Sequence, residues 1–490
     1  MCIIFLFCFK GLPMNEIIQS ITSFLSNILF FDILFGQVEG TSIPFLVAWL
    51  FAGAIFFTIK MGFVNLRFFR HAMQILSGKY ADPHNKGLIT PFQSLTTALS
   101  ATVGLGNIAG VAVAIMIGGA GATFWMIVAG FLNMSLKFTE VTLSLQHRTF
   151  LPDGSVMGGG MRYLSEGLKE KGLEGLGKVL AWVFALFMIG GALGGGNIFQ
   201  VSQSLGAVKG EISFFASYPW AYGVILAIAT GFVIIGGVKS IAHTTEKIVP
   251  LMVAIYLGAS IYILIVNYAL IPDAIATIIR EAFSPTAVTG GIIGVMIQGF
   301  KRASFSSEAG IGSAPIAHAP SQVKYPIQQG LVALYEPFID TVVICTITAL
   351  VIVTTGVYSG GTPELNAMIE ARQGAALTSA AYAMTISWFP TLLAISVTLF
   401  AFSTMISWSY YGERAWTYLF GAKSSIIFKI IFLISIVLST LVENLSTLVD
   451  FTDMLFLAMA LPNLIGLYIL RDNVKNALDE YTKRLKNGDL

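Results

Sequence analysis

Two apolar stretches of this chain are each interrupted by a Gly-x-Gly triplet that has polar residues beside it. The first triplet, Gly104-Leu105-Gly106, lies within residues 95–118, and the second, Gly310-Ile311-Gly312, lies within residues 290–319. In a bilayer, a helix is interrupted only where protein or a water-filled cavity satisfies the freed backbone groups. A chain with 49 glycines in 490 residues contains such triplets by chance, so their position inside membrane-length stretches gives them weight. Matched breaks in two halves of a membrane chain indicate the binding site of a repeat-built transporter.

The composition indicates a membrane protein built of helices. The chain is 56% hydrophobic and only 11% charged, whereas ordinary soluble domains carry about 25% charged residues. Stretches of about 20 apolar residues recur along its length, which is the length a membrane-spanning helix needs. The sequence has no basic stripe on a soluble domain, so nothing in it indicates a nucleic-acid partner. The three cysteines (Cys2, Cys8 and Cys345) have neither disulfide nor metal-ligand spacing.

We predict an all-α polytopic fold with about 11 transmembrane helices. The spans are expected at about 43–62, 92–118, 121–146, 179–207, 219–237, 246–269, 288–318, 329–356, 383–410, 425–442 and 446–470. Residues 1–42 are expected to form an N-terminal extension whose segment 15–36 is an interfacial helix, and 471–490 a cytoplasmic tail.

The order of the spans predicts an inverted repeat. The span 43–62 is peripheral, and the other spans divide into a first five-helix repeat, 92–269, and a second, 288–470. An odd number of spans per repeat inserts the two halves with opposite orientation, and each half opens with a broken helix. Most of the 28 Lys and Arg residues then fall on one side. The positive-inside rule therefore predicts a cell-membrane protein with its N-terminus outside and its C-terminus in the cytoplasm.

The residues around the breaks suit a zwitterion and a small cation. Free N–H groups at a break attract a carboxylate, and free carbonyls attract a hard cation. Sodium needs a cage of oxygens, and five side chains near the breaks or on the ninth predicted span could each supply one: Thr102, Asn107, Ser313, Ser403 and Thr404. The alternative for each is an ordinary interhelical hydrogen bond.

Four stretches carry a resemblance to a known family. They are 103–115 (VGLGNIAGVAVAI), 301–315 (KRASFSSEAGIGSAP), 338–346 (FIDTVVICT) and 410–413 (YYGE). The chain resembles the alanine or glycine:cation symporter family from about residue 43 to 470, with departures from the usual family form at Ala120 and Ser307. The resemblance implies a leucine-transporter-like 5+5 inverted repeat and sodium- or proton-coupled import of small neutral amino acids.

The same resemblance implies a substrate site. Gly104 and Gly106 would offer backbone to the substrate carboxylate, and Gln200 would contact the polar end of the amino acid. The residues implied to close the side-chain pocket are Phe305, Thr404 and Trp408. Thr404 and Trp408 are four residues apart and share a helix face, which supports the assignment independently. The alternative for the two aromatic residues is helix packing and, for Trp408, a position at the lipid interface.

Two sodium arrangements are implied, and the sequence does not choose between them. In one, Asn107 acts with the substrate carboxylate and with Ser306 or Ser313. In the other, backbone carbonyls around Val103 act with residues of the ninth predicted span, which are Ala401, Ser403 and Thr404. Sodium is expected as the coupling ion, with no cofactor.

Charged residues inside the membrane are expected to be functional or to hold the broken helices in shape. Arg302 and Glu308, beside the second break, are interpreted as a scaffold that pairs with each other or with freed carbonyls. Lys137 and Glu140, spaced i, i+3, are expected to form an ordinary helix pair.

The sequence therefore predicts a secondary symporter that imports alanine, glycine or both with sodium by alternating access. The alternative is a proton-coupled carrier of another small zwitterion. An intramembrane enzyme is less favoured because no Ser/His/Asp or His/Glu constellation is present in the sequence. The partners expected are the amino acid, sodium and the lipid bilayer, with no nucleic acid and no obligate protein partner.

Overall fold

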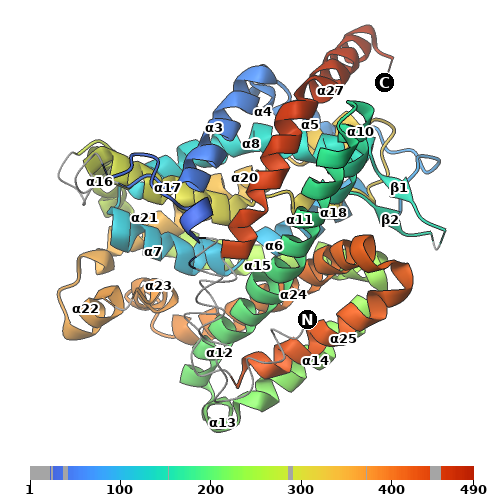
Figure 1. The fold of residues 1–490 in the computed structure, drawn as a ribbon. Helices are drawn as coiled ribbons and strands as arrows, with labels where there is room; N and C mark the ends of the chain where they lie inside the picture. Colours follow the sequence, from blue (N-terminus) through green and yellow to red (C-terminus); the bar gives the residue numbers. More distant parts are fainter. Residues whose placement is uncertain are drawn as a thin grey trace.

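The computed structural model describes residues 23, 26–36, 42–152, 154–284, 291–370, 372–441 and 454–489. These residues are helical except for loops and one antiparallel hairpin of β1 (Thr149–Phe150) and β2 (Val156–Met157) (Figure 1). The predicted N-terminal extension and its interfacial helix lie largely outside the described residues.

Among the described residues, seven helices are long and apolar enough to cross a membrane, and a bent pair makes an eighth. The seven are Ala122–Gln146 (α8), Glu174–Glu211, Gly237–Val266 (α15), Pro326–Thr355, Phe389–Phe420 (α24), Ala422–Ser439 and Met454–Asn487. Shorter apolar helices occupy two further predicted spans, α3 (Phe45–Lys60) and α14 (Pro219–Ile235). The prediction of an all-helical, multi-pass membrane protein is confirmed.

Several of these helices are composite. Glu174–Glu211 consists of α11 (Glu174–Leu193), the π-helical turn η3 (Gly194–Ile198) and α12 (Phe199–Glu211); Pro326–Thr355 includes α19 (Pro326–Val332), α20 (Tyr335–Pro337), η5 (Phe338–Cys345) and α21 (Thr346–Thr355). The last two spans contain α25 (Ser425–Ser439) and α27 (Ala460–Asn487). The connecting segments are α4 (Val64–Arg67), α5 (Phe69–Leu76), α9 (Gly160–Arg162), η2 (Tyr163–Gly167), α10 (Leu168–Glu170), α13 (Ser213–Ser217), η4 (Tyr268–Leu270), α16 (Ile271–Ala282), η6 (Val357–Ser359), α22 (Pro363–Glu370), α23 (Gly374–Ala383) and η7 (Ala422–Ser424).

The first predicted break is present. Helix α6 (Pro91–Thr102) begins with a capping box, in which Thr90 Oγ1 accepts the Gln93 N–H at 3.1 Å and Gln93 Oε1 accepts the Thr90 N–H at 3.0 Å. The helix ends where Val103 adopts an extended conformation. The chain resumes as the π-helical turn η1 (Gly106–Gly110) and α7 (Val111–Gly118), and the two halves are bent by 54°.

The second break is also present. Helix α17 (Gly291–Ser307) stops before Glu308, and α18 (Ala314–His318) follows. Gly310 and Gly312 have φ of +83° and +86°, and Glu308 has φ of +53°. Left-handed backbone strongly favours glycine. At Gly312 a Cβ would also lie 2.9 Å from the Phe184 ring. Glycine is therefore favoured there both by the backbone conformation and by the packing.

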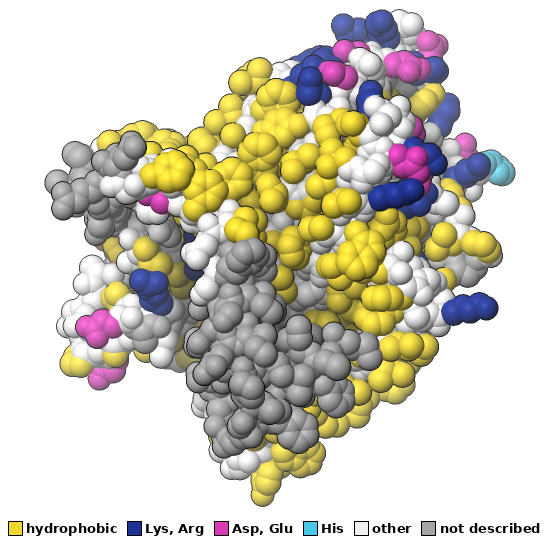
Figure 2. All heavy atoms as spheres, in the orientation of Figure 1, with side chains coloured by type: hydrophobic (Ala, Val, Ile, Leu, Met, Phe, Trp, Pro, Cys, Tyr) yellow, Lys and Arg dark blue, Asp and Glu magenta, His cyan; other side chains and the backbone are white. Residues whose placement is uncertain are grey.

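Helix α24 lies at the centre of the molecule, where it packs against α6, α11, α12 and α15. The predicted tail 471–490 is mostly a continuation of α27, held by an ion pair of 2.6 Å between Lys60 and Asp472. Figure 2 shows hydrophobic side chains across the middle of one face and charged side chains gathered at the end where α27 stops. This distribution fits an apolar band with polar ends.

Candidate functional site

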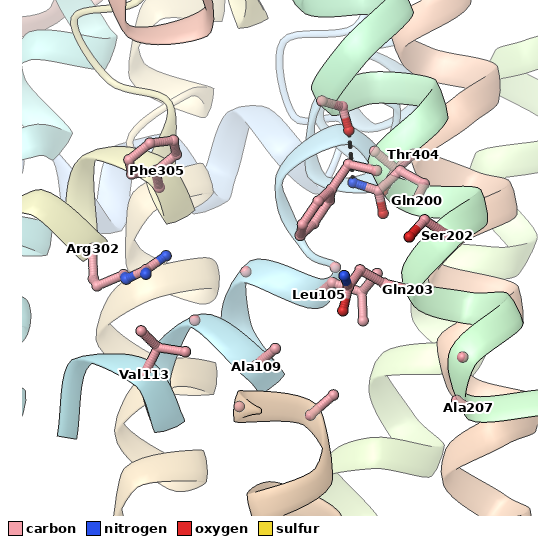
Figure 3. A pocket seen from close by; sticks show the side chains of 18 of the residues that line it. Leu105, Ala109, Val113, Gln200, Ser202, Gln203, Ala207, Arg302, Phe305 and Thr404 are labelled. Atoms are coloured by element: carbon pink, nitrogen blue, oxygen red, sulfur yellow. Dashed lines mark hydrogen bonds between the residues drawn. The ribbon is translucent and has the colours of Figure 1, made fainter. Parts of the chain in front are cut away.

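A cavity of about 980 Å³ lies beside both breaks. The residues of its lining that matter here are Gly104, Gly106, Gln200, Arg302, Phe305, Glu308, Thr404, Trp408 and Phe456. Figure 3 shows Arg302 and Phe305 on one side of this space and Gln200 and Thr404 on the other, with Leu105 between them. Every residue that the sequence predicted for substrate contact therefore lines one cavity.

Gln200 presents an unused hydrogen-bond acceptor to this cavity. Its Nε2 donates to the Gly195 carbonyl at 3.0 Å, drawn as a dashed line in Figure 3. Its Oε1 has no hydrogen-bond partner among the described residues, although the side chain is only 8% exposed. Buried polar atoms are nearly always paired, so this oxygen points to a ligand that donates a hydrogen bond.

Three aromatic rings form one wall. The Phe305 and Phe456 rings stack with centroids 5.5 Å apart and planes 4° apart, and Phe456 lies 5.5 Å from Trp408. Trp408 is only 2% exposed, which excludes the lipid-interface position. A Cβ on Gly196 would lie 2.4 Å from the Trp408 Cβ, so glycine is needed there for the ring to pack. Phe456 and Gly196 were not predicted as site residues.

Asn107 connects the two breaks through a buried carboxylate. Its Oδ1 accepts the Gly104 N–H at 2.8 Å, and its Nδ2 donates to Asp340 Oδ1 at 2.6 Å and to Ser306 Oγ at 3.0 Å. The Ser306 hydroxyl donates to Asp340 Oδ2 at 2.5 Å, and the Thr341 hydroxyl donates to the same oxygen at 2.8 Å. Asp340, on η5, is fully buried and was not predicted as a site residue.

Two residues of the second predicted sodium arrangement, Ser403 and Thr404, contact α6 where it packs against α24. Thr404 Oγ1 and Ser403 Oγ donate to the Ser100 carbonyl at 3.0 and 3.4 Å. Val103 and Ala401 are buried at 1% and 0% exposure. A Cβ on Gly104 would lie only 3.2 Å from Thr404 Oγ1, so the glycine permits this close approach.

Ser313 does not join the predicted sodium set of Asn107 and Ser306. Its hydroxyl donates to Glu308 Oε2 across the second break, and no contact with Asn107 is present among the described residues. The predicted pair of Lys137 with Glu140 also needs correction, because the ion pair of Lys137 Nζ is with Glu336 Oε1 on α20, at 3.1 Å. Helical spacing showed which side chains share a face, but tertiary packing supplied a closer carboxylate.

Comparison with known proteins identifies the family of this chain. Residues 30–490 match the Sodium:alanine symporter family. The sodium/alanine symporter AgcS of Methanococcus maripaludis is 39% identical over 91% of this chain and 95% of its own length. An uncharacterized transporter of Haemophilus influenzae is 35% identical over 88% of this chain and 92% of its own. The probable sodium/glutamine symporter GlnT of Bacillus subtilis is 32% identical over 90% and 89%.

Because the matched family consists of symporters, the alternative of an intramembrane enzyme, which the sequence left less favoured, is excluded. The match also covers both breaks and every cavity residue discussed above. The chain belongs to the Sodium:alanine symporter family.

Proposed function

We propose that this chain imports a small neutral amino acid together with sodium, by alternating access through the cavity beside the two breaks. The observation that carries the proposal is the pairing of an unused acceptor, Gln200 Oε1, with a glycine break on the opposite wall. The acceptor suits an ammonium group, and the positive end of the helix that starts at Gly106 suits a carboxylate. Together they recognise a zwitterion.

The amino acid is placed with its carboxylate at Gly104 and Gly106 and its ammonium at Gln200. The Gly104 N–H is occupied by Asn107 Oδ1, so the carboxylate takes backbone donors from Gly106 onward. The side chain then lies against Thr404 and the aromatic wall of Phe305, Phe456 and Trp408. Such a wall limits the size of the side chain by steric overlap and favours alanine and glycine.

Replacing Gln200 by leucine is expected to raise the KM for amino-acid uptake about tenfold or more, because a hydrogen bond to a charged group contributes about 1.5–3 kcal/mol. The KM is measured as the concentration dependence of amino-acid uptake by purified protein in liposomes. Gln200→Glu keeps an acceptor and is expected to bind substrate better than Gln200→Leu. Equal loss in both variants would show that Gln200 only packs.

Replacing Phe456 by alanine is expected to let larger amino acids compete with alanine. The change removes the ring that stacks on Phe305 and Trp408, and it opens space where a long side chain would otherwise clash. Competition of labelled alanine uptake by unlabelled glutamine and leucine measures the effect. Phe420→Ala, at the 55% exposed ring that ends α24, is the control. Unchanged selectivity in Phe456→Ala would contradict the wall.

Sodium is assigned to the site formed by Asn107, Ser306 and Asp340. These side chains lie within 2.5–3.0 Å of one another. Asp340 and Ser306 offer carboxylate and hydroxyl oxygens, the hard ligands that a small cation prefers. Asn107 turns its Nδ2 toward both of them and its Oδ1 toward the Gly104 N–H, so it positions these two ligands. Asp340 also supplies the negative charge that compensates for burying a cation. The meeting point of Ser100, Ser403 and Thr404 is the second candidate, with Val103 and Ala401 carbonyls as its further ligands.

The same proposal includes eleven spans, a 5+5 inverted repeat and an N-out, C-in orientation. In that orientation three residues of the cavity lining lie toward the outside, namely Glu211, Arg372 and Pro390. The opposite half of α6 is closed against its neighbours, with Gln93 Nε2 2.9 Å from Glu246 Oε2 and Thr97 Oγ1 3.1 Å from Thr245 Oγ1. These contacts support an outward-facing state as part of the proposal, in which the path to the cytoplasm is closed.

Uptake of labelled alanine, glycine and glutamine into proteoliposomes tests the proposal, with sodium, lithium or only a proton gradient applied. We expect sodium-dependent uptake of alanine or glycine. Uptake that follows the proton gradient and ignores sodium would replace sodium coupling by proton coupling. No uptake of any of the three under all conditions would reject the substrate class.

A further inference from the structure

Near the second break lie three ionisable groups that do not line the transport cavity, namely Lys137, Glu140 and Glu336. Lys137, Glu140 and Glu336 are fully buried, and Glu308 is 3% exposed. Glu140 and Glu308 both lie within electrostatic reach of the Lys137 ammonium. Three carboxyl groups therefore share one lysine, and two of them, Glu140 and Glu336, are fully buried and do not line the cavity. A buried charge that is not compensated is so costly that the group usually neutralises.

An ion pair and a histidine contact identify Glu336 as an ionised member of this cluster. Its Oε1 lies 3.1 Å from Lys137 Nζ, and its Oε2 lies 3.3 Å from His318 Nε2. Nδ1 of the same histidine lies 2.6 Å from Gln329 Nε2, and Gln329 Oε1 accepts the Ser321 hydroxyl. Gln329 thus donates to Nδ1, which leaves the histidine proton on Nε2, directed at Glu336. Glu336 therefore has an ion pair with Lys137 at Oε1, which makes no hydrogen bond among the described residues, and a hydrogen-bond donor at Oε2; no such ion pair within 4.0 Å is present for Glu140 among those residues.

Glu140 has a donor for only one of its oxygens. Asn463 Nδ2 donates to Glu140 Oε1 at 2.7 Å, whereas Glu140 Oε2 has no hydrogen-bond partner among the described residues. The hydrogen-bonding capacity of Asn463 is already used, because its Nδ2 also donates to the Gly310 carbonyl at 2.9 Å and its Oδ1 accepts the Tyr163 hydroxyl. The remaining charged and titratable groups around Glu140 are Lys137, Glu336 and Tyr163.

We propose that Glu140 is a proton-binding site and stands in this structure as a neutral carboxylic acid, with Glu336 as the partner of Lys137. The ligand is a proton taken from water, which converts the carboxylate to an acid.

The proton matters to the second break because Asn463 bonds both Glu140 and the Gly310 carbonyl. Loss of the proton puts a second negative charge beside Glu336 and draws Lys137 and Asn463 toward Glu140. The donor that holds the freed Gly310 carbonyl is then shared with a full charge. The break is therefore expected to be most stable with Glu140 protonated, and to lose stability as the pH rises. This inference does not depend on which amino acid or ion the cavity carries.

Infrared spectroscopy of the purified protein tests the proposal directly. The wild type, labelled with ¹³C in the glutamate carboxyl groups, is expected to show a carbonyl stretch of a protonated glutamic acid at neutral pH that shifts with the label. Glu140→Gln is expected to lose that band. Glu480→Gln, an exposed residue bonded to Arg484 on α27, is the control and is expected to keep it.

Two further results separate Glu140 from its neighbours. Glu308→Gln is expected to keep the Glu140 band, so a band that vanishes in Glu308→Gln but persists in Glu140→Gln would overturn the assignment. If Glu140→Gln fails to fold, the spectrum of the labelled wild type still tests the proposal. The absence of any band of a protonated glutamic acid in that spectrum would reject it. Thermal unfolding is a second readout: the wild-type midpoint should fall at alkaline pH, and that of Glu140→Gln should fall less. Identical pH profiles would contradict the proposal.

Discussion

Replacing Asp340 by asparagine is expected to raise the sodium concentration for half-maximal amino-acid uptake at least about tenfold, which corresponds to about 1.4 kcal/mol of binding free energy. Asparagine has nearly the shape of aspartate and keeps hydrogen-bonding partners at Asn107 and Ser306. It removes the negative charge that compensates a bound cation in a fully buried position. Sodium titrations of uptake at saturating and limiting alanine measure the change.

The control is Asp472→Asn, at a half-exposed carboxylate paired with Lys60. A surface pair contributes about 0–1 kcal/mol, so this variant should titrate with sodium like the wild type. Coupling between ligands is reciprocal, so Asp340→Asn should also reduce the gain in alanine affinity that sodium gives the wild type. Normal sodium dependence in Asp340→Asn at normal protein abundance would exclude Asp340 as a ligand. It would favour the site at Ser403 and Thr404.

Local features of the sequence were sufficient to predict the two breaks. Glycine is the residue that tolerates the left-handed backbone seen at Gly310 and Gly312. The 54° bend after Thr102 likewise occurs where glycines interrupt an apolar stretch. Hydropathy likewise predicted the helices, because the bilayer imposes their length. The placement of Gln200, Phe305, Thr404 and Trp408 came instead from the family resemblance, and one cavity contains all four.

Asp340 and Phe456 could not be assigned from local pattern. Asp340 meets Asn107 across 233 residues of sequence, and Phe456 lies in an apolar segment with nothing to distinguish it. The one available signal was the charge of Asp340 inside a predicted span, since an intramembrane ionisable residue is functional by default. Periodicity places a residue on a helix face, but only packing shows which residues that face meets. The same reason explains why Lys137 pairs with Glu336 and not with its neighbour Glu140.

Replacing Lys137 by methionine is expected to destabilise the protein by about 3–5 kcal/mol, the usual cost of removing one partner from a buried ion pair. Methionine fills much of the space of the lysine stem, so the loss is mainly electrostatic. Lys137 is fully buried and has carboxyl groups on α8, on α20 and at the second break within its reach. Unfolding in mixed micelles with increasing SDS measures the free energy. Lys178→Met, at an exposed helix pair with Glu174, is the control and should change stability by less than about 0.5 kcal/mol.

The double variant Lys137→Met/Glu336→Gln decides whether charge or packing causes that loss. Removing the negative charge of Glu336 along with the lysine leaves no uncompensated pair, so the double variant should be more stable than Lys137→Met alone. Residues in contact show such non-additivity, whereas two independent packing defects would add. A double variant that is less stable than either single variant would mean that Lys137 acts through the volume of its side chain. Recovery of stability would show that the ion pair of Lys137 and Glu336 stabilises the second break by compensating charge. Glu308 and the contacts of Asn463 with Glu140 and Gly310 lie in the same cluster.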